Sequence, residues 1–373
     1  MSAPQVLING LALNQPMGGV RRHAVEVFPR AAAILQERGG SLTMLTPRSG
    51  LGFRLPGVQL IKSRASSSRL QRILGQKRLL KSAAATSGPF DLIHGGHLPA
   101  SGPEGIALVH LQHDLRRQGS FLGRYWLKRA IQRSSCVITV SQASADELLR
   151  IATPRNLRVI HHGGDHLTRC TRSTPKDPFI LIPGHLQPRK DPLTAIRALA
   201  QDPSLPTLLF AGAVRGGMAQ RMQTEAARLG VLDRVRYAGP IPDADMAELY
   251  ASCSAVLLPS RLEGFGLPIL EALNAGARLV VSDIPAHAEI APSTTPRFAV
   301  GDPEDCARAL RQALDQAPLE VPIWTWDKAA ESLVAAWESA ADERQAVMAP
   351  TSAIPPTMTK DPAIATFSGW PTR

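Results

Sequence analysis

Short apolar runs alternate with helical patterns along most of the chain, and this alternation constrains the fold more than any other feature. In the first half, runs such as QVLINGLAL and CVITVS are separated by predicted helices near residues 19–36, 121–133 and 142–151. Because parallel strands need crossover connections, the alternation predicts βα units and a mostly parallel sheet. The same rhythm restarts at FILIPG, residues 179–184, and predicts a second α/β sheet in the second half.

The two predicted sheets divide the chain into domains. The division falls in a polar segment rich in Gly, Thr and Pro, residues 161–178. We therefore predict an N-terminal domain over 1–170 and a C-terminal domain over 171–347, which includes a helix near 326–347. Two facing α/β domains form a cleft, a common place for a ligand. The remaining residues, 348–373, contain five prolines and little apolar periodicity, so we predict a flexible tail.

Cysteine and apolar patterns narrow the class of protein. The four cysteines lie far apart with no Cys-x-x-Cys pair, which indicates neither a zinc site nor a disulfide framework. No stretch approaches the roughly 18 to 20 uninterrupted apolar residues of a membrane span. The first residues are typical of a first strand and not of a signal peptide. We expect a reduced, cytoplasmic protein.

Charge differs sharply between the two halves. Residues 1–175 hold 24 Lys and Arg against 8 Asp and Glu, whereas the remainder holds 18 against 23. The basic excess indicates an anionic partner for the N-terminal half. A nucleic-acid-binding protein is one interpretation of a pI near 10.1, but aromatic residues make up only 5% and no nucleic-acid-binding module is present.

The segment LPSRLEGFGLPILEALNAG, residues 258–276, carries the clearest chemical signal. It is expected to run from a buried strand through a glycine turn into a helix, at the strand edge where ligands bind in open α/β sheets. Free amides at the start of that helix suit anionic or oxygen-rich groups. Glu271 can accept two hydrogen bonds from a vicinal diol such as a ribose, and Glu263 could meet a second hydroxylated ring.

This segment resembles the paired-glutamate motif of retaining glycosyltransferases with the GT-B architecture, which use nucleotide-sugar donors. The resemblance implies two Rossmann-like domains facing across a cleft, with the acceptor on the N-terminal domain and the donor on the C-terminal one. It implies that Glu263 contacts the transferred hexose and Glu271 the ribose. The backbone around Gly264, Phe265, Gly266 and Leu267 would bind the donor sugar.

Further segments resemble the same family. ILIPGHLQPRKD, residues 180–191, matches the strand and loop whose basic pair, here Arg189 and Lys190, holds the donor diphosphate after Gly184. Many relatives have Arg directly after this glycine, whereas this chain has His185. Either Arg189 takes the role of that Arg, or the donor diphosphate is bound more weakly. Gly18 and Gly19 match the N-terminal glycine loop, whose helix amides could meet the diphosphate.

Two other matches involve a histidine and the base site. LVHLQHDL, residues 108–115, resembles the strand-end His-Asp pair and would place His113 beside the sugar being transferred. His113 could instead be a metal ligand with His110 and Asp114, or a core histidine. The loop that includes Ile241 is expected to cradle the base. Asp243-Ala244-Asp245 resembles a metal-diphosphate motif, but an Asp that caps the following helix is the preferred interpretation.

The resemblance implies transfer of a hexose, and mannose is the expected sugar. The expected acceptor is a saccharide or a polyprenyl-diphosphate-linked sugar in polysaccharide biosynthesis. No metal or other cofactor is expected to take part. Sugar-nucleotide epimerisation and phosphorolysis on the same fold are alternatives. Residues 120–135 interleave Phe121, Leu122, Trp126 and Leu127 with four basic residues, which suits an anionic bilayer as well as solvated surface charge. Peripheral attachment to the inner face of the plasma membrane is therefore one expectation.

Overall fold

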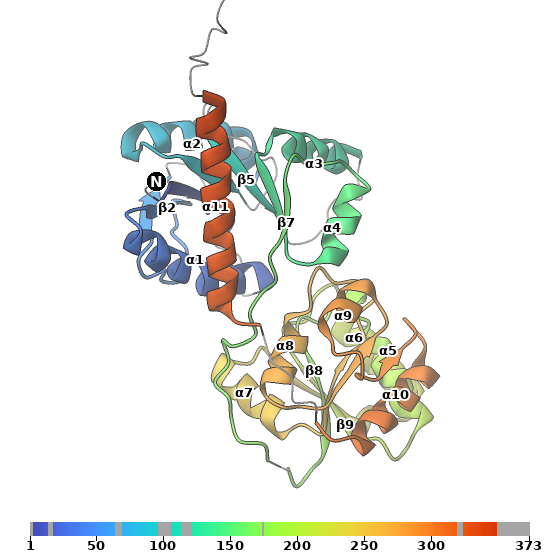
Figure 1. The fold of residues 1–373 in the computed structure, drawn as a ribbon. Coiled ribbons are helices and arrows are strands. Elements are labelled where there is room, and N and C mark those ends of the chain that lie inside the picture. The colour runs from blue at the N-terminus through green and yellow to red at the C-terminus, as the bar shows by residue number, and fades with distance from the viewer. Residues whose placement is uncertain are drawn as a thin grey trace, which may run out of the picture.

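The chain forms two α/β domains, each built on a parallel sheet (Figure 1). The computed structural model describes residues 3–13, 18–63, 69–95, 106–112, 121–173, 175–318 and 324–348. Residues 349–373, for which a flexible tail is predicted, lie outside these ranges. Among the described residues, no helix has both the length and the apolar character needed to cross a membrane.

The N-terminal sheet has seven strands in the order β3-β2-β1-β4-β5-β6-β7, all parallel. Its strands are β1 (Gln5–Asn9), β2 (Ser41–Thr46), β3 (Gln59–Lys62), β4 (Leu92–Gly95), β5 (Ala107–Gln112), β6 (Cys136–Thr139) and β7 (Leu157–Val159). Its crossover helices are α1 (Gly19–Glu37), α2 (Arg69–Ser87), α3 (Phe121–Arg133) and α4 (Gln142–Leu149). Strands β4 and β6 are buried along their whole length, as is typical of parallel strands that are covered on both faces.

The C-terminal sheet has six parallel strands in the order β10-β9-β8-β11-β12-β13. They are β8 (Phe179–Pro183), β9 (Thr207–Ala211), β10 (Val235–Gly239), β11 (Ala255–Leu258), β12 (Leu279–Ser282) and β13 (Arg297–Phe298). The α-helices are α5 (Pro192–Gln201), α6 (Met218–Arg228), α7 (Asp243–Ser252), α8 (Leu267–Asn274), α9 (Pro285–Ile290) and α10 (Pro303–Asp315). Two 3₁₀ turns, η2 (Pro188–Lys190) and η3 (Leu232–Arg234), precede α5 and β10.

The last described helix, α11 (Trp326–Met348), returns to the N-terminal domain (Figure 1). It packs along α1 and reaches β4 and β5, with Trp337 fully buried and its indole N–H donating to His94 Nδ1 at 3.1 Å. The range 171–347 predicted for the C-terminal domain therefore includes a helix whose contacts lie with the other sheet. Helical periodicity reveals that α11 has an apolar face, but it does not reveal which domain covers that face.

The chain crosses between the domains twice, and the first crossing is tightly packed against the start of α11 and against α8. A Cβ atom on Gly163 would lie 2.2 Å from the backbone nitrogen of Trp326, and one on Gly164 would lie 2.4 Å from Leu270 Cβ on α8. A single apolar cluster extends from the N-terminal sheet through Trp326 to Phe265 and Leu270. The first crossing is thus held between the start of α11 and the helix that carries Glu271.

Candidate active site: two glutamates beside a domain interface

The predicted glycine turn forms between β11 and α8. Gly266 has φ +121°, a conformation that L side chains rarely adopt, and a Cβ there would also approach Ile269 Cδ1 at 3.1 Å. The turn ends at Leu267, and Pro268 occupies the first turn of α8, where no intrahelical N–H is required. Gly266 and Pro268 thus shape one short loop-and-helix unit, in which Glu263 lies in the loop and Glu271 lies in the helix.

Glu263 lies among cations. Its carboxylate is 2.5 Å from Lys190 Nζ and 2.9 Å from Arg189 Nη1, and it accepts a 2.7 Å hydrogen bond from Ser260 Oγ. Its side chain is only 8% exposed. Burial alone would raise the pKa of Glu263, but Lys190, Arg189 and the hydrogen bonds outweigh burial and hold the pKa at about 2. The structure therefore brings together three of the predicted catalytic residues.

The basic pair lies in the η2 turn, which has its own supports. Asp191 follows it with φ +46°, uncommon outside glycine, and its carboxylate accepts from Thr194 Oγ1 and pairs with Arg261 Nη2, both at 2.8 Å. The backbone N–H of Arg261 donates to the Arg189 carbonyl at 2.7 Å. Sequence reasoning did not identify Asp191 or Arg261 as supports, because their contacts join segments about seventy residues apart.

Gly184 lies beneath the same turn. It has φ +103°, and a Cβ there would approach Lys190 Nζ at 3.8 Å. His185, the departure from the family pattern, follows it and is half-buried.

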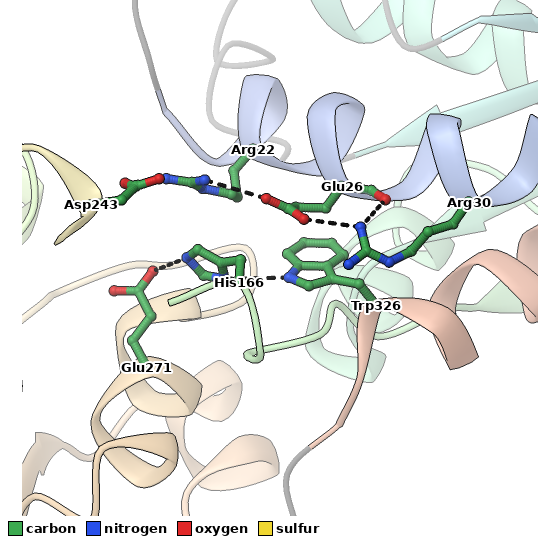
Figure 2. Close-up of polar contacts among 7 residues, drawn as sticks. All are labelled: Arg22, Glu26, Arg30, His166, Asp243, Glu271 and Trp326. Carbon is green, nitrogen blue, oxygen red and sulfur yellow. Dashed lines mark hydrogen bonds and ion pairs between the residues drawn. The ribbon is translucent and has the colours of Figure 1, made fainter. Parts of the chain in front are cut away.

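Glu271 is held by residues that sequence reasoning did not select. Tyr250 donates to its Oε2 at 2.5 Å. His166 Nε2 lies 3.2 Å from its Oε1 (Figure 2). Burial would raise the pKa of Glu271, but these two partners and the positive charge of Arg22 lower it. A buried Tyr two turns into a helix gives no sequence signal for this role, because its ordinary place is the core.

Gly18 and Gly19, the glycines of the predicted N-terminal loop, lie at the start of α1, and Gly19 lies close to the start of α8. Gly18 is the N-cap residue of α1, and a Cβ on Gly19 would lie 3.9 Å from Leu267 Cδ1. One turn later, Arg22 reaches across to Asp243 on α7 at 2.5 Å (Figure 2). Ile241, predicted to border the base, is partly buried just before that helix. His113 lies outside the described residues.

Asp243 does not cap α7 as predicted. The helix begins at Asp243, its N-cap residue is Pro242, and no side chain caps it. The Asp243 carboxylate pairs with Arg22 instead, an interaction across domains that the local sequence does not encode. Among the described residues, no three His, Cys, Asp or Glu side chains cluster to hold a metal ion.

A second set of contacts fastens the glycine turn to the N-terminal domain. Ser141 and Ser144, at the start of α4, both donate to the carbonyl oxygen of Gly264, at 2.7 and 2.9 Å. Glu289 on α9 accepts from the backbone N–H groups of Gln142 and Ala143. His161 Nε2 lies 2.7 Å from the same carboxylate.

Phe265 is placed by aromatic packing. Its side chain is 5% exposed, and its ring centroid lies 4.7 Å from that of His162 and 6.1 Å from those of His161 and Trp324. The Phe265 side chain is therefore a structural anchor of the turn, and only the backbone of this residue is free to serve the predicted donor site.

Comparisons with known proteins agree with this arrangement. Residues 17–166 match the family described as Glycosyltransferase Family 4, and residues 169–322 match Glycosyl transferases group 1. The comparisons support a glycosyltransferase of the GT-B type, and the predicted GT-B fold is confirmed by two parallel-sheet domains and by solved structures of that architecture. Sucrose-phosphate synthase from Thermosynechococcus elongatus is one, with a TM-score of 0.69, 20% identity and coverage of 93% of this chain and 98% of that one.

Other relatives carry more specific names. The D-inositol 3-phosphate glycosyltransferases of Streptomyces scabiei and Streptomyces avermitilis are each 28% identical to this chain, over 53% and 66% of its length. These alignments span 53% and 64% of the relatives' own length, between about half and two thirds. The HepE protein of Anabaena, solved in complex with UDP and glucose, matches with a TM-score of 0.62 and 18% identity over 92% of this chain and 98% of its own.

Proposed function

We propose that the protein transfers a hexose, with retention of configuration, from a nucleotide-sugar to an acceptor hydroxyl. The observation that carries this proposal is the placement of Glu263 against Arg189 and Lys190, in the turn that leads into the helix of Glu271. One such unit offers a carboxylate for sugar hydroxyls, two cations for a diphosphate and a second carboxylate for a ribose. GDP-mannose is our first candidate donor, and UDP-hexoses are the second because HepE was solved with UDP.

In the proposed reaction, the bond between the sugar C1 and the diphosphate oxygen breaks while the acceptor oxygen bonds to C1 on the same face. The acceptor proton passes to the departing diphosphate. Arg189 and Lys190 stabilise the negative charge that grows on the leaving group, the type of interaction that contributes most to such reactions. Arg189 takes the role that an Arg at position 185 has in many relatives. Gly18, Gly19 and His113 belong to the N-terminal side of this proposed site, and no metal or cofactor takes part.

The acceptor is proposed to be anionic and to bind the N-terminal domain. Helix α3 exposes Arg124, Lys128, Arg129 and Arg133 beside Tyr125 and Trp126, which are 48% and 46% exposed. Basic residues beside exposed aromatics suit phosphate groups at a lipid surface, each basic group contributing about 1 kcal/mol near anionic lipid. A polyprenyl-diphosphate-linked sugar has this character. The relatives named for D-inositol 3-phosphate point to a phosphorylated acceptor as well.

Donor binding is the first test. Thermal unfolding of the chain and of Glu271→Ala is followed with UDP, GDP, ADP and their hexose conjugates. A ligand that binds only the folded state raises the melting temperature by mass action. We expect one nucleotide to stabilise the chain and Glu271→Ala to lose most of that effect. Absence of any shift at millimolar concentration contradicts the donor site.

Product analysis then tests the reaction. With donor and an added lipid-diphosphate-linked or inositol-phosphate acceptor, NMR of the product should show the anomeric configuration of the donor. A new sugar nucleotide formed from donor alone would indicate epimerisation. A sugar 1-phosphate formed only with inorganic phosphate would indicate phosphorolysis. Either result replaces the transfer reaction proposed here.

A further inference from the structure

His166 connects the domain crossing to Glu271, and this connection is not part of the reaction described above. The imidazole is 1% exposed and lies on the first crossing between the domains. On one side the indole N–H of Trp326, the first residue of α11, donates to Nδ1 at 3.2 Å. On the other side Nε2 lies 3.2 Å from Glu271 Oε1 (Figure 2).

The hydrogen bond that Trp326 donates to Nδ1 determines the tautomer of the His166 imidazole. Because Trp326 can only donate, Nδ1 of His166 must accept and carries no proton. The proton of a neutral imidazole is then on Nε2, where it is donated to Glu271. Tyr250 donates to Oε2, so each carboxylate oxygen of Glu271 has one donor from the protein and retains acceptor capacity for a ligand hydroxyl.

The surroundings leave His166 little freedom to move. The backbone N–H of Trp326 donates to Asp165 Oδ1 at 2.8 Å, and the N–H of Gly164 donates to the Trp324 carbonyl at 2.8 Å. Gly163 and Gly164 are in the close contacts with Trp326 and α8 described above. The orientation of the Glu271 carboxylate is thus tied to the position of α11, which belongs to the N-terminal domain.

We propose that His166, oriented by the indole of Trp326, is a positioning residue that aims the Glu271 carboxylate at the ribose diol of the donor. The inference rests on the proposed function, because it assumes a nucleotide at Glu271. Its consequence is specific: loss of His166 lowers the preference for a ribonucleotide over its 3′-deoxy analogue, and affects binding of the diphosphate less. A packing role alone would weaken both nucleotides equally.

The test measures dissociation constants for UDP, GDP and ADP and their 3′-deoxy analogues by calorimetry. His166→Phe retains an aromatic ring but removes the donor, whereas the amide of His166→Gln can still donate to Glu271. We expect the wild-type chain to prefer the ribose form by about tenfold, the value of one hydrogen bond to a charged group. His166→Phe should bring this ratio close to one, and His166→Gln should restore most of it.

A matched control exists in the same fold. His94 is buried and accepts from Trp337 on α11 at 3.1 Å, the same type of Trp–His hydrogen bond within the N-terminal domain. His94→Phe should therefore lower stability without changing the ribose preference. If His166→Phe does not fold, Trp326→Phe carries the test, because it removes the N–H that fixes the tautomer while it keeps an aromatic ring at this buried position, and it should also reduce the ratio.

The outcomes separate the two proposals. A wild-type preference that persists in His166→Phe and Trp326→Phe overturns the positioning role while leaving the donor site intact. An equal loss of preference in His94→Phe also overturns it, since the effect would then be one of general packing. If none of the three nucleoside diphosphates binds the wild-type chain, the donor site itself is wrong and the inference is wrong with it.

Discussion

Ser141 Oγ, at the start of α4, donates a 2.7 Å hydrogen bond to the carbonyl oxygen of Gly264, 123 residues later in the chain. Ser141 Oγ also accepts a hydrogen bond from the backbone N–H of Ser144. One hydroxyl therefore caps a helix of the N-terminal domain and holds the glycine turn of the C-terminal domain. Ser144 Oγ is the second donor to Gly264. The peptide between Gly264 and Phe265 is therefore oriented by the opposite domain.

We expect the double substitution Ser141→Ala with Ser144→Ala to weaken donor binding by more than the two single substitutions combined. Each single variant leaves one hydroxyl that donates to the Gly264 carbonyl, and the effects of substitutions at residues that share a partner are not additive. Donor dissociation constants for the four forms measure this coupling. Additive effects would show that the two hydroxyls do not share a role.

A cap on another helix provides the control for Ser141. Asp302 caps α10 by accepting from the backbone N–H groups of Glu304 and Asp305. Asp302→Ala and Ser141→Ala should each cost about 1 kcal/mol of stability, the typical value of an N-cap. Only Ser141→Ala should also change the dissociation constant of the donor.

Lys190→Met should reduce the turnover of sugar transfer by about 100-fold to 1,000-fold, the range typical of removing one group that stabilises transition-state charge. Lys190 lies 2.5 Å from Glu263, and loss of its charge should also raise the pKa of Glu263 toward 4.5. Steady-state kinetics measure the first effect. A control is Arg221→Met, which removes an exposed cation on α6. Equal turnover in the two variants would contradict the role of Lys190.

The stability of the fold should fall as pH drops from 6.5 toward 4, and His287 should account for part of the fall. Burial lowers the pKa of His287 from 6.5 to about 4, so in this window the unfolded chain binds a proton that the folded chain does not. The stabilising difference is fully present above pH 6.5. Urea unfolding of wild type and His287→Gln across this range tests the prediction, and equal slopes with pH would contradict it.

The ion pair between Arg22 and Asp243 should contribute up to about 1 kcal/mol to association of the domains, because Asp243 is 51% exposed and water screens the pair. Arg22→Glu should destabilise the chain, and Asp243→Arg in the same chain should recover part of the loss. The recovery should shrink in high salt. Melting temperatures of the two single variants and the swapped pair at two salt concentrations provide the measurement.

Anionic vesicles should bind α3 through its exposed aromatic and basic residues. Trp126→Ala and Lys128→Glu should both reduce co-sedimentation with phosphatidylserine vesicles, since apolar insertion and charge attraction act together. Arg221→Glu on the C-terminal domain gives the same change of charge at a distant site and should have little effect. If Arg221→Glu reduces co-sedimentation as much as Lys128→Glu does, net charge rather than α3 governs binding.

Local sequence determined the elements and the identity of the central unit. Strand-like runs and helical periods predict β8, β11, α3 and α8 close to their observed bounds, because burial pattern and glycine conformation are local properties. They also predict that Glu263 and Glu271 flank one turn. Helix α10 was not predicted, although Asp302 and Pro303 are ordinary start signals for it.

Tertiary structure alone decided which residues surround that unit. Glu271 contacts Tyr250 and His166, Gly264 accepts from Ser141, and Asp243 pairs with Arg22. Of these partners, all but Tyr250 lie before β8, in the first half of the chain. A sequence pattern reports the period of a helix, but not which face meets another domain. Packing between the domains determines those contacts, and α11 lies on the N-terminal domain because α1, β4 and β5 cover its apolar face.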